Sequence, residues 1–167
     1  TSRAVVRAVQ ILQVLELPSR RLLIWLAGVQ LRRAQKRGLV VIGIAGSYAK
    51  TSVKHALFHT LSSKHCTLMT PASFNTPLGI ANTIRKKLTA QHELFLVEMG
   101  EYYPGDLAQL NRWLKPTITV VTPIGSNHLE RFGSQETLES SFQELVNGDH
   151  TPEKLIVDTV NKKLFPQ

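Results

Sequence analysis

The sequence contains a single cysteine, Cys66, among its 167 residues, so it cannot form an internal disulfide. This excludes the small secreted domains that depend on disulfides and is typical of a reducing compartment. Aromatic residues make up only 7% of the chain. The longest uncharged apolar run covers residues 22–31, which is half of the ~20 residues that a membrane-spanning helix needs. The chain also lacks an initiating methionine and a signal-peptide pattern, so we expect a piece of a longer protein.

Acidic residues are almost absent from residues 1–38, where Glu16 stands against eight lysines and arginines. The remaining residues contain 12 basic and 11 acidic side chains, so the net charge of +8 belongs almost entirely to the first segment. No aromatic residues are interleaved with these basic residues in the way that nucleic-acid-binding surfaces require. We therefore expect no nucleic-acid partner.

The basic segment predicts two helices, over residues 4–16 and 21–36, with Pro18 and Ser19 between them. We expect a basic helical hairpin, residues 1–38, that precedes a folded domain at residues 39–167. Two roles stay open for this leader. It either packs on the rest of the chain or joins it to an upstream domain, or it lies on an anionic membrane surface with Trp25 at the interface.

Short apolar runs rich in β-branched residues alternate with helical patterns after residue 38. The runs cover residues 39–45, 66–70, 94–99, 117–122 and 154–159, and the helical patterns cover residues 51–63, 78–88, 105–114 and 135–146. This alternation predicts an α/β fold, a three-layer parallel sheet of the P-loop type with helices on both faces. Ligands of such sheets bind beyond the carboxyl ends of the strands, which places the candidate site at residues 46–50, 71–77, 98–105 and 122–128.

The segment GIAGSYAKTS, residues 43–52, leads from an apolar strand through small residues into a helix. Backbone amides of such a loop and the positive end of the helix bind phosphate groups. We therefore predict a nucleotide site formed by Gly46, Ser47, Tyr48, Ala49, Lys50, Thr51 and Ser52. Lys50 would reach the terminal phosphates, and the hydroxyl of Thr51 or Ser52 would bind Mg²⁺. Ala49 stands where the P-loop pattern has glycine, which costs about 1–2 kcal/mol if the position needs a positive φ.

Two further side chains at strand ends are candidate metal ligands. Glu98 closes an apolar strand, and a buried carboxylate is costly unless it is paired or binds a metal. His128 follows the strand at 117–122, although Mg²⁺ prefers oxygen donors. Cys66 has no second cysteine for a metal site, and we expect a core thiol at the start of a strand.

Four motifs in this order resemble the central ATP-binding domain of the Mur ligase family, over residues 39–158. They are GIAGSYAKTS (43–52), SFNTPLGIANTI (73–84), VEMGEYYPGDLAQL (97–110) and TPIGSNHLERFGS (122–134). Within the family, the sequence is most similar to the branch that adds D-alanyl-D-alanine to UDP-N-acetylmuramoyl tripeptide. The resemblance implies ATP-dependent amide formation through an acyl phosphate, with ATP and Mg²⁺ as cofactors and with a UDP-muramoyl peptide and an amino acid or dipeptide as substrates.

The same resemblance implies roles for individual residues. Lys50, Glu98 and His128 would be catalytic, and Thr51, Glu98 and His128 would lie at the metal positions. Asn75 and Thr76 match the loop that approaches the UDP-sugar-peptide substrate.

The chain departs from the family pattern at Ala49 and ends before the family's later segments, so we expect the domain to be incomplete at its C-terminus and inactive in isolation. Two alternatives stay open, a catalytically silent nucleotide-binding scaffold and a ligase similar to folylpolyglutamate synthases. We expect a cytoplasmic protein, held at the inner face of the membrane if residues 1–38 bind lipid.

Overall fold

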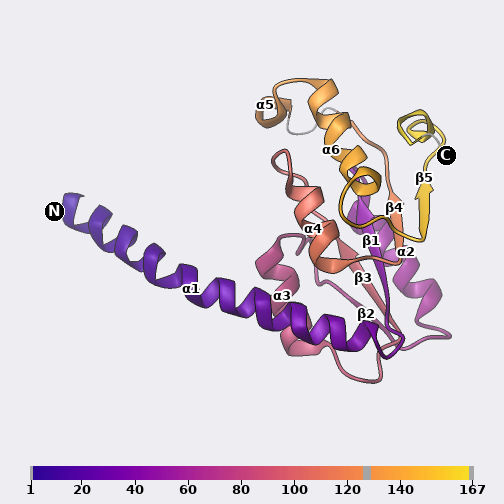
Figure 1. Ribbon diagram of the computed structural model, residues 1–167, viewed down its shortest axis with the longest axis horizontal. Coiled ribbons are helices and arrows are strands. Elements are labelled where there is room, and N and C mark those ends of the chain that lie inside the picture. The colour runs from indigo at the N-terminus through magenta and orange to yellow at the C-terminus, as the bar shows by residue number, and fades with distance from the viewer. Residues whose placement is uncertain (1, 126–128, 166–167) are drawn as a thin grey trace.

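The computed structural model describes the backbone of residues 2–125 and 129–165. At its centre lies a five-stranded parallel sheet with the strand order β2-β3-β1-β4-β5 (Figure 1). The strands are β1 (Val40–Ala45), β2 (Thr67–Met69), β3 (Leu94–Glu98), β4 (Ile118–Val121) and β5 (Lys154–Val157). All four neighbouring pairs run parallel, which confirms the predicted α/β architecture.

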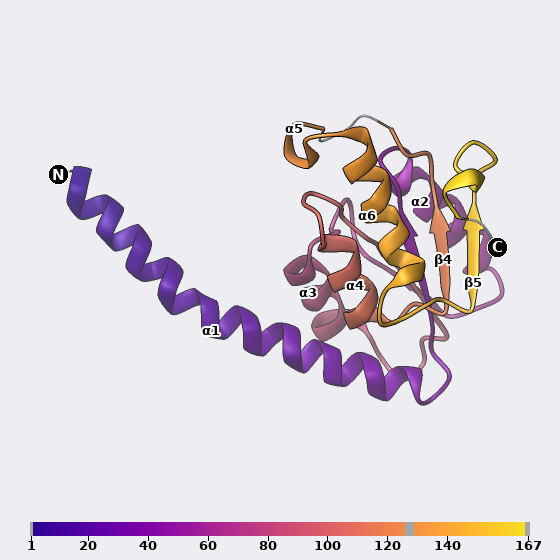
Figure 2. The same cartoon turned by 45° about the horizontal axis from the view of Figure 1, so that its top comes forward.

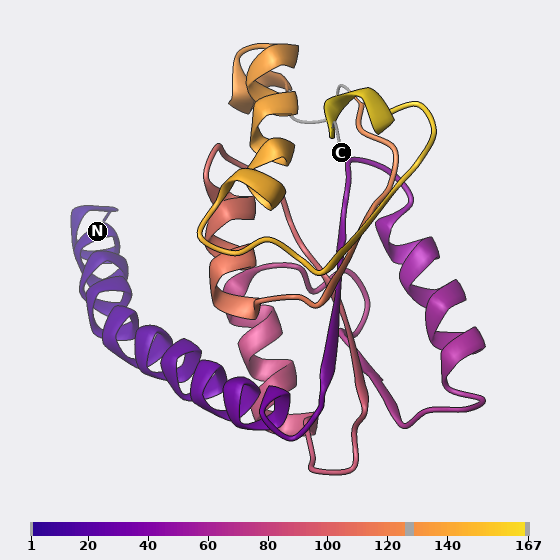
Figure 3. The same cartoon turned by 45° about the vertical axis from the view of Figure 1, so that its right-hand side comes forward.

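Helices cover both faces of the sheet, as the sequence predicts (Figure 3). One face is covered by α2 (Lys50–Leu61), and the other by α1 (Ser2–Gln35), α3 (Pro77–Lys87), α4 (Asp106–Leu114) and α6 (Gln135–Asn147). Two short helices, α5 (Leu129–Phe132) and η1 (Lys162–Leu164), complete the described elements. The predicted strands and the four predicted helices after residue 38 differ from the observed ones by no more than two residues at either end.

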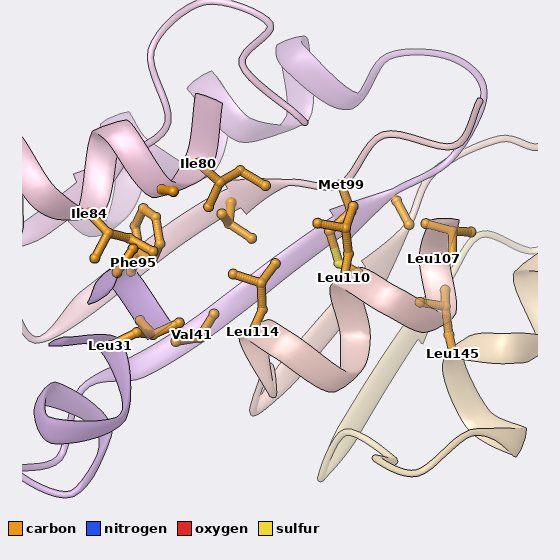
Figure 4. Packing of buried hydrophobic residues seen from close by; sticks show 14 of the residues in the cluster. Leu31, Val41, Ile80, Ile84, Phe95, Met99, Leu107, Leu110, Leu114 and Leu145 are labelled. Atoms are coloured by element: carbon orange, nitrogen blue, oxygen red, sulfur yellow. The ribbon is translucent and has the colours of Figure 1, made fainter. Parts of the chain in front are cut away.

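The hydrophobic core is divided by the sheet because successive strand residues point to opposite faces. Val41 of β1 lies in the larger cluster, with Phe95, Ile80 and Leu110 (Figure 4). Ile42, its neighbour in the chain, lies in the smaller cluster beneath α2. Strands that are apolar on both faces are expected where helices cover both sides of a parallel sheet.

The predicted helical hairpin at residues 1–38 is wrong, because α1 is one continuous helix that contains Pro18. A proline inside a helix removes one backbone hydrogen bond and crowds the preceding turn, which bends a helix without reversing it. The helix is accordingly curved, and its N-terminal half projects away from the sheet (Figure 2). No helix within the described residues combines the length and the hydropathy that a bilayer span requires.

The C-terminal half of α1 packs on the rest of the chain. Leu31 and Ala34 are buried in the larger core cluster. The Gln30 side chain donates hydrogen bonds to the carbonyl oxygens of Ile84 and Leu88, at 3.1 and 3.0 Å, at the end of α3. The Ile84 carbonyl also accepts from the N–H of Leu88, whereas the Leu88 carbonyl is one that a helix end leaves without a backbone partner. The leader therefore contributes to the core and to the capping of α3.

The expected core thiol is also wrong, because Cys66 is exposed. It precedes β2, which lies at the edge of the sheet, so only β3 lies beside that strand. The carboxyl ends of the central strands, in contrast, lie close together. Ile44 pairs with Glu98 and Ala45 pairs with Val121, and the segments that follow β1, β3 and β4 therefore meet at one edge.

Candidate functional site

The loop between β1 and α2 has a fixed backbone with two residues in the left-handed region. Gly46 has a φ of +139°, and a Cβ atom there would lie 2.0 Å from Oγ1 of Thr122. The Thr122 hydroxyl donates to the carbonyl oxygen of Tyr48 at 2.6 Å and so ties the loop to the end of β4. Ala49 has a φ of 61° and precedes the first residue of α2, so this position does adopt the conformation that favours glycine.

The backbone amides of the loop divide into two groups. The N–H groups of Ser47 and Tyr48 donate to the carbonyl oxygen of Pro123, at 3.0 and 3.1 Å. Among the described residues, the N–H groups of residues 50–52 have no acceptor. These are the unsatisfied donors at the first turn of α2, where the helix dipole adds positive potential. Free backbone donors are therefore available at the first turn of α2, inside the segment that the sequence predicts for phosphate binding.

Lys50, at the start of α2, has its ammonium group above the loop. Nζ lies 2.9 and 3.1 Å from the two carboxylate oxygens of Glu101, and it also donates to the carbonyl oxygen of Gly46. Two other predicted loop residues are more exposed: the Tyr48 ring, which contacts Gly125, and Ser52 on the outer side of α2. The loop therefore has one cation, Lys50, and free amides at the start of α2.

Glu98 is almost completely buried at the end of β3 and accepts several hydrogen bonds. Oε2 accepts from the Thr51 hydroxyl at 2.9 Å and from the Lys54 ammonium at 3.0 Å. Lys54 is fully buried and donates as well to the carbonyl oxygen of Ala72. The carboxylate is thus paired with a cation, and pairing or metal binding is what a buried carboxylate requires.

The same geometry fits a magnesium ion. Oε1 of Glu98 has only a long contact, 3.5 Å, to the Asn75 amide, and the Thr51 hydroxyl lies next to the same carboxylate. Mg²⁺ prefers such oxygen donors and usually completes its shell with phosphate oxygens and water. No group of three histidine, cysteine, aspartate or glutamate side chains that could hold a metal occurs in residues 2–125 and 129–165. The predicted ligand His128 lies outside the described residues.

The predicted substrate residues line a neighbouring pocket. The Thr76 hydroxyl accepts from the N–H of Gly79 at 3.3 Å, which caps α3. The Asn75 side chain lies between Glu98 and Tyr102, whose hydroxyl donates to Asn75 Oδ1 at 3.1 Å. Both residues line a pocket of about 250 Å³ together with eight others. These are Pro77, Gly100, Tyr102, Tyr103, Asp106, Gln109, Leu110 and Arg131.

The pocket carries one cation at its rim. The guanidinium carbon of Arg131 in α5 lies 5.7 Å from the ring centre of Tyr102 and 5.5 Å from that of Tyr103. Such cation–π contacts hold the guanidinium group in place without using its N–H donors. No carboxylate within the described part of the chain pairs with Arg131. The pocket can therefore offer these donors to an anionic group.

Burial perturbs the protonation of Glu101. Desolvation raises the pKa of this carboxyl from 4.5 to about 7, although the neighbouring Lys50 ammonium opposes the shift. The negative charge of Glu98 adds to the increase. The ionised form of Glu101 is therefore less favourable than that of an exposed carboxylate, despite the ion pair.

Four residues of the site were not predicted from the sequence, namely Lys54, Glu101, Tyr102 and Arg131. Lys54 follows Lys50 by one helical turn, so the spacing could have placed both ammonium groups on one face of α2. Glu101 lies three residues after Glu98, in a segment that the strand-end argument already marked. Nothing local to the sequence indicates that Arg131 reaches the two tyrosines, because α5 is distant from them in the chain.

Comparisons with known proteins agree on one family. Residues 44–165 match the family described as Mur ligase middle domain. The UDP-N-acetylmuramoyl-tripeptide--D-alanyl-D-alanine ligase of Bacillus subtilis is 31% identical over 114 residues, which are 68% of this chain and 25% of that protein. The ligase of the same name from Mycobacterium tuberculosis is 35% identical over 108 residues, 65% of this chain and 21% of that protein.

Solved structures give the same result. MurF from Acinetobacter baumannii superposes with a TM-score of 0.76 and 25% identity, over 87% of this chain and 32% of that one. MurF from Thermotoga maritima in complex with ADP has a TM-score of 0.72 and 31% identity, over 83% of this chain and 31% of that one. The chain spans about a quarter of the length of these curated relatives and about a third of these solved chains. Because the family match covers most of its residues, the chain belongs to the Mur ligase family and corresponds to the middle domain.

Proposed function

We propose that this chain is the ATP-binding domain of an ATP-dependent ligase that joins an amino acid or dipeptide to a UDP-muramoyl peptide in peptidoglycan synthesis. The observation that carries the proposal is the arrangement of Lys50, Thr51 and Glu98 around the first turn of α2. The relatives support D-alanyl-D-alanine as the added group, since the curated proteins described above carry that name. They favour this assignment over a ligase similar to folylpolyglutamate synthases.

ATP binding follows from groups that the loop already positions. The free amides of residues 50–52 and the Lys50 ammonium donate to the terminal phosphate oxygens. Thr51 and Glu98 would hold Mg²⁺, which would supply positive charge to neutralise the phosphates. Lys54 pairs with the Glu98 carboxylate at 3.0 Å and fixes its orientation. The loop thus collects positive charge where the transferring phosphoryl group lies.

The reaction has two steps. A carboxylate oxygen of the muramoyl peptide attacks the γ-phosphorus of ATP, and the bond from that phosphorus to ADP breaks. The amine of the incoming amino acid or dipeptide then attacks the acyl carbon, phosphate leaves with the bond electrons, and the amine gives up a proton. The chain contributes by positioning and by electrostatic stabilisation, which supply most of the catalysis in phosphoryl transfer. His128 is proposed as a further catalytic and metal-binding residue on the resemblance alone.

The peptide substrate occupies the pocket beside Glu98. Thr76 and Asn75 line it, and Arg131 supplies a cation at its rim. Tyr102 and Tyr103 offer apolar surface for aliphatic parts of the peptide. Asn75, whose side-chain amide lies 3.5 Å from Glu98, connects this pocket to the residues around the loop.

We place the protein in the cytoplasm, with residues 1–38 in contact with the inner face of the membrane. Leu22 and Trp25 of α1 are 55% and 59% exposed, and the exposed Arg21 lies beside them. Apolar and basic side chains together favour an anionic lipid surface. Binding to vesicles that contain phosphatidylglycerol, and loss of binding when Leu22 and Trp25 are both replaced by serine, would support this contact.

The division into a leader at residues 1–38 and a domain at residues 39–167 that is incomplete at its C-terminus also stays a proposal. So does the expectation that the chain alone is inactive. The relatives described above are about four to five times as long as the region matched, which supports the expectation of inactivity. A ligase assay on the protein with all the flanking segments that its gene encodes, beside the 167-residue chain, would test them.

Titration calorimetry of Mg²⁺ and ATP tests the nucleotide site. We expect saturable binding by the wild type and its loss in Lys50→Ala, with Lys64→Ala, an exposed lysine after α2, as the control. Ala49→Gly should bind at least as well as the wild type. Binding only after Ala49→Gly would favour the silent scaffold instead, and no dependence on Lys50 would reject the site.

A further inference from the structure

A second buried carboxylate, Glu101, lies beside the loop and has no part in the proposed mechanism. It is 2% exposed and accepts from Lys50 with both oxygens, at 2.9 and 3.1 Å. Lys50 also donates to the carbonyl oxygen of Gly46. An ammonium group has three N–H donors, so these three oxygens account for all of them. A phosphate oxygen can bind Lys50 only if one of these acceptors gives way.

The charges of the cluster around the loop cancel. The cluster consists of two ammonium groups, Lys50 and Lys54, and two carboxylates, Glu98 and Glu101, joined in two ion pairs. Lys54 is buried against Glu98 and does not reach the loop surface. Lys50 is therefore the cation available to phosphate in this cluster, and Glu101 is the group that neutralises it.

We infer that Glu101 is a positioning residue that competes with the terminal phosphates of ATP for Lys50 and so lowers the affinity for ATP. The inference rests on the proposed function, since it assumes that Lys50 binds phosphate. A carboxylate in contact with Lys50 lies within several ångströms of any phosphate that Lys50 binds. At the effective dielectric constant of such sites, repulsion over ~6 Å changes an affinity by about tenfold or more.

Glu101→Gln separates the charge of this side chain from its shape. The amide oxygen of glutamine still accepts a hydrogen bond from Lys50, while the negative charge is removed. Burial raises the pKa of Glu101 to about 7, so binding should be measured at pH 8, where the wild-type carboxyl is mostly ionised. Glu153→Gln, at an exposed position, is the matched control for loss of one negative charge.

We expect calorimetry with Mg²⁺ to give at least about tenfold tighter ATP binding in Glu101→Gln than in the wild type. The gain should be similar for ADP and absent for adenosine, because only the phosphates meet Lys50. A purely structural role would instead change all three ligands alike. Melting temperatures of the variants, measured in the same buffer, establish that each is folded.

The outcomes separate the two proposals. If Lys50→Ala loses ATP while Glu101→Gln binds it no more tightly than the wild type, or more weakly, this inference is overturned and the nucleotide site stands. An equal gain for adenosine overturns it as well. If no variant binds ATP, the proposed function fails, and the inference fails with it.

Discussion

Replacing Lys54 by methionine isolates the energetic role of the fully buried lysine. The side chain is 0% exposed, and its ammonium lies 3.0 Å from Glu98, which is itself almost completely buried. Methionine fills a similar volume without the charge, and it leaves the Glu98 carboxylate with the Thr51 hydroxyl and a long contact to an amide. Breaking a buried ion pair on one side costs about 3–5 kcal/mol, because the remaining charge is uncompensated. That is a large part of a domain's usual stability, about 5–15 kcal/mol.

Urea unfolding followed by circular dichroism measures this loss as a decrease in the free energy of unfolding. Lys64→Met, at an exposed position, should change the same quantity by no more than about 0.5 kcal/mol. The double variant Lys54→Met with Glu98→Gln should recover most of the loss, since neither charge then remains buried. If Lys54→Met is no more destabilising than Lys64→Met, or if the double variant is the least stable of all, the argument from uncompensated charge is wrong.

Four further changes test other parts of the site. Gly46→Ala brings a Cβ atom to 2.0 Å from Thr122 Oγ1, so we expect a loss of about 2 kcal/mol or more in urea unfolding, together with loss of ATP binding in calorimetry. Ala49→Gly relieves a φ of 61° and should raise the free energy of unfolding by about 0.5–1 kcal/mol, whereas a decrease would mean that the methyl group makes a needed contact. Arg131→Met should raise the KM for the muramoyl peptide about tenfold in the ligase assay without changing kcat; an equal fall in kcat would contradict a binding role. Finally, burial raises the pKa of Glu101 from 4.5 to about 7, so the folded state holds its proton more tightly than the unfolded state. The free energy of unfolding should fall by on the order of 3 kcal/mol as the pH rises between these two values. Denaturation at a series of pH values should show that the free energy of unfolding depends less steeply on pH in Glu101→Gln than in the wild type.

The sheet, its covering helices and the position of the site could be predicted from local patterns. Strands buried on both faces produce continuous apolar runs, and the helices between them repeat with a different period. Because ligands bind beyond the carboxyl ends of parallel strands, the sequence also predicts that Gly46, Glu98 and Thr122 lie at one edge of the sheet. These features depend on the periodicity of the chain, which a sequence displays directly.

The errors concern interactions between distant segments. Pro18 and Ser19 favour a break in the helix, yet α1 continues through them. No nearby residue indicates whether the helix ends or only bends at this proline. The exposure of Cys66 depends on β2 being an edge strand, which is a property of strand order. Lys54 is similar, because a lysine on a helix is usually solvated, and its buried partners, Glu98 and the carbonyl group of Ala72, are distant in the chain.

The pairing of charges also reduces the desolvation cost of placing charged side chains at the site. Lys50 and Lys54 are spaced by one turn on α2, and Glu98 and Glu101 follow the end of one strand, so each cation meets one carboxylate. Each pair offsets part of the desolvation penalty of its buried carboxylate. The consequence is that stability and phosphate binding depend on the same four side chains. A substitution at any one of them changes both properties, and only a comparison of single with paired variants, measured for unfolding and for ATP binding, can separate the two effects.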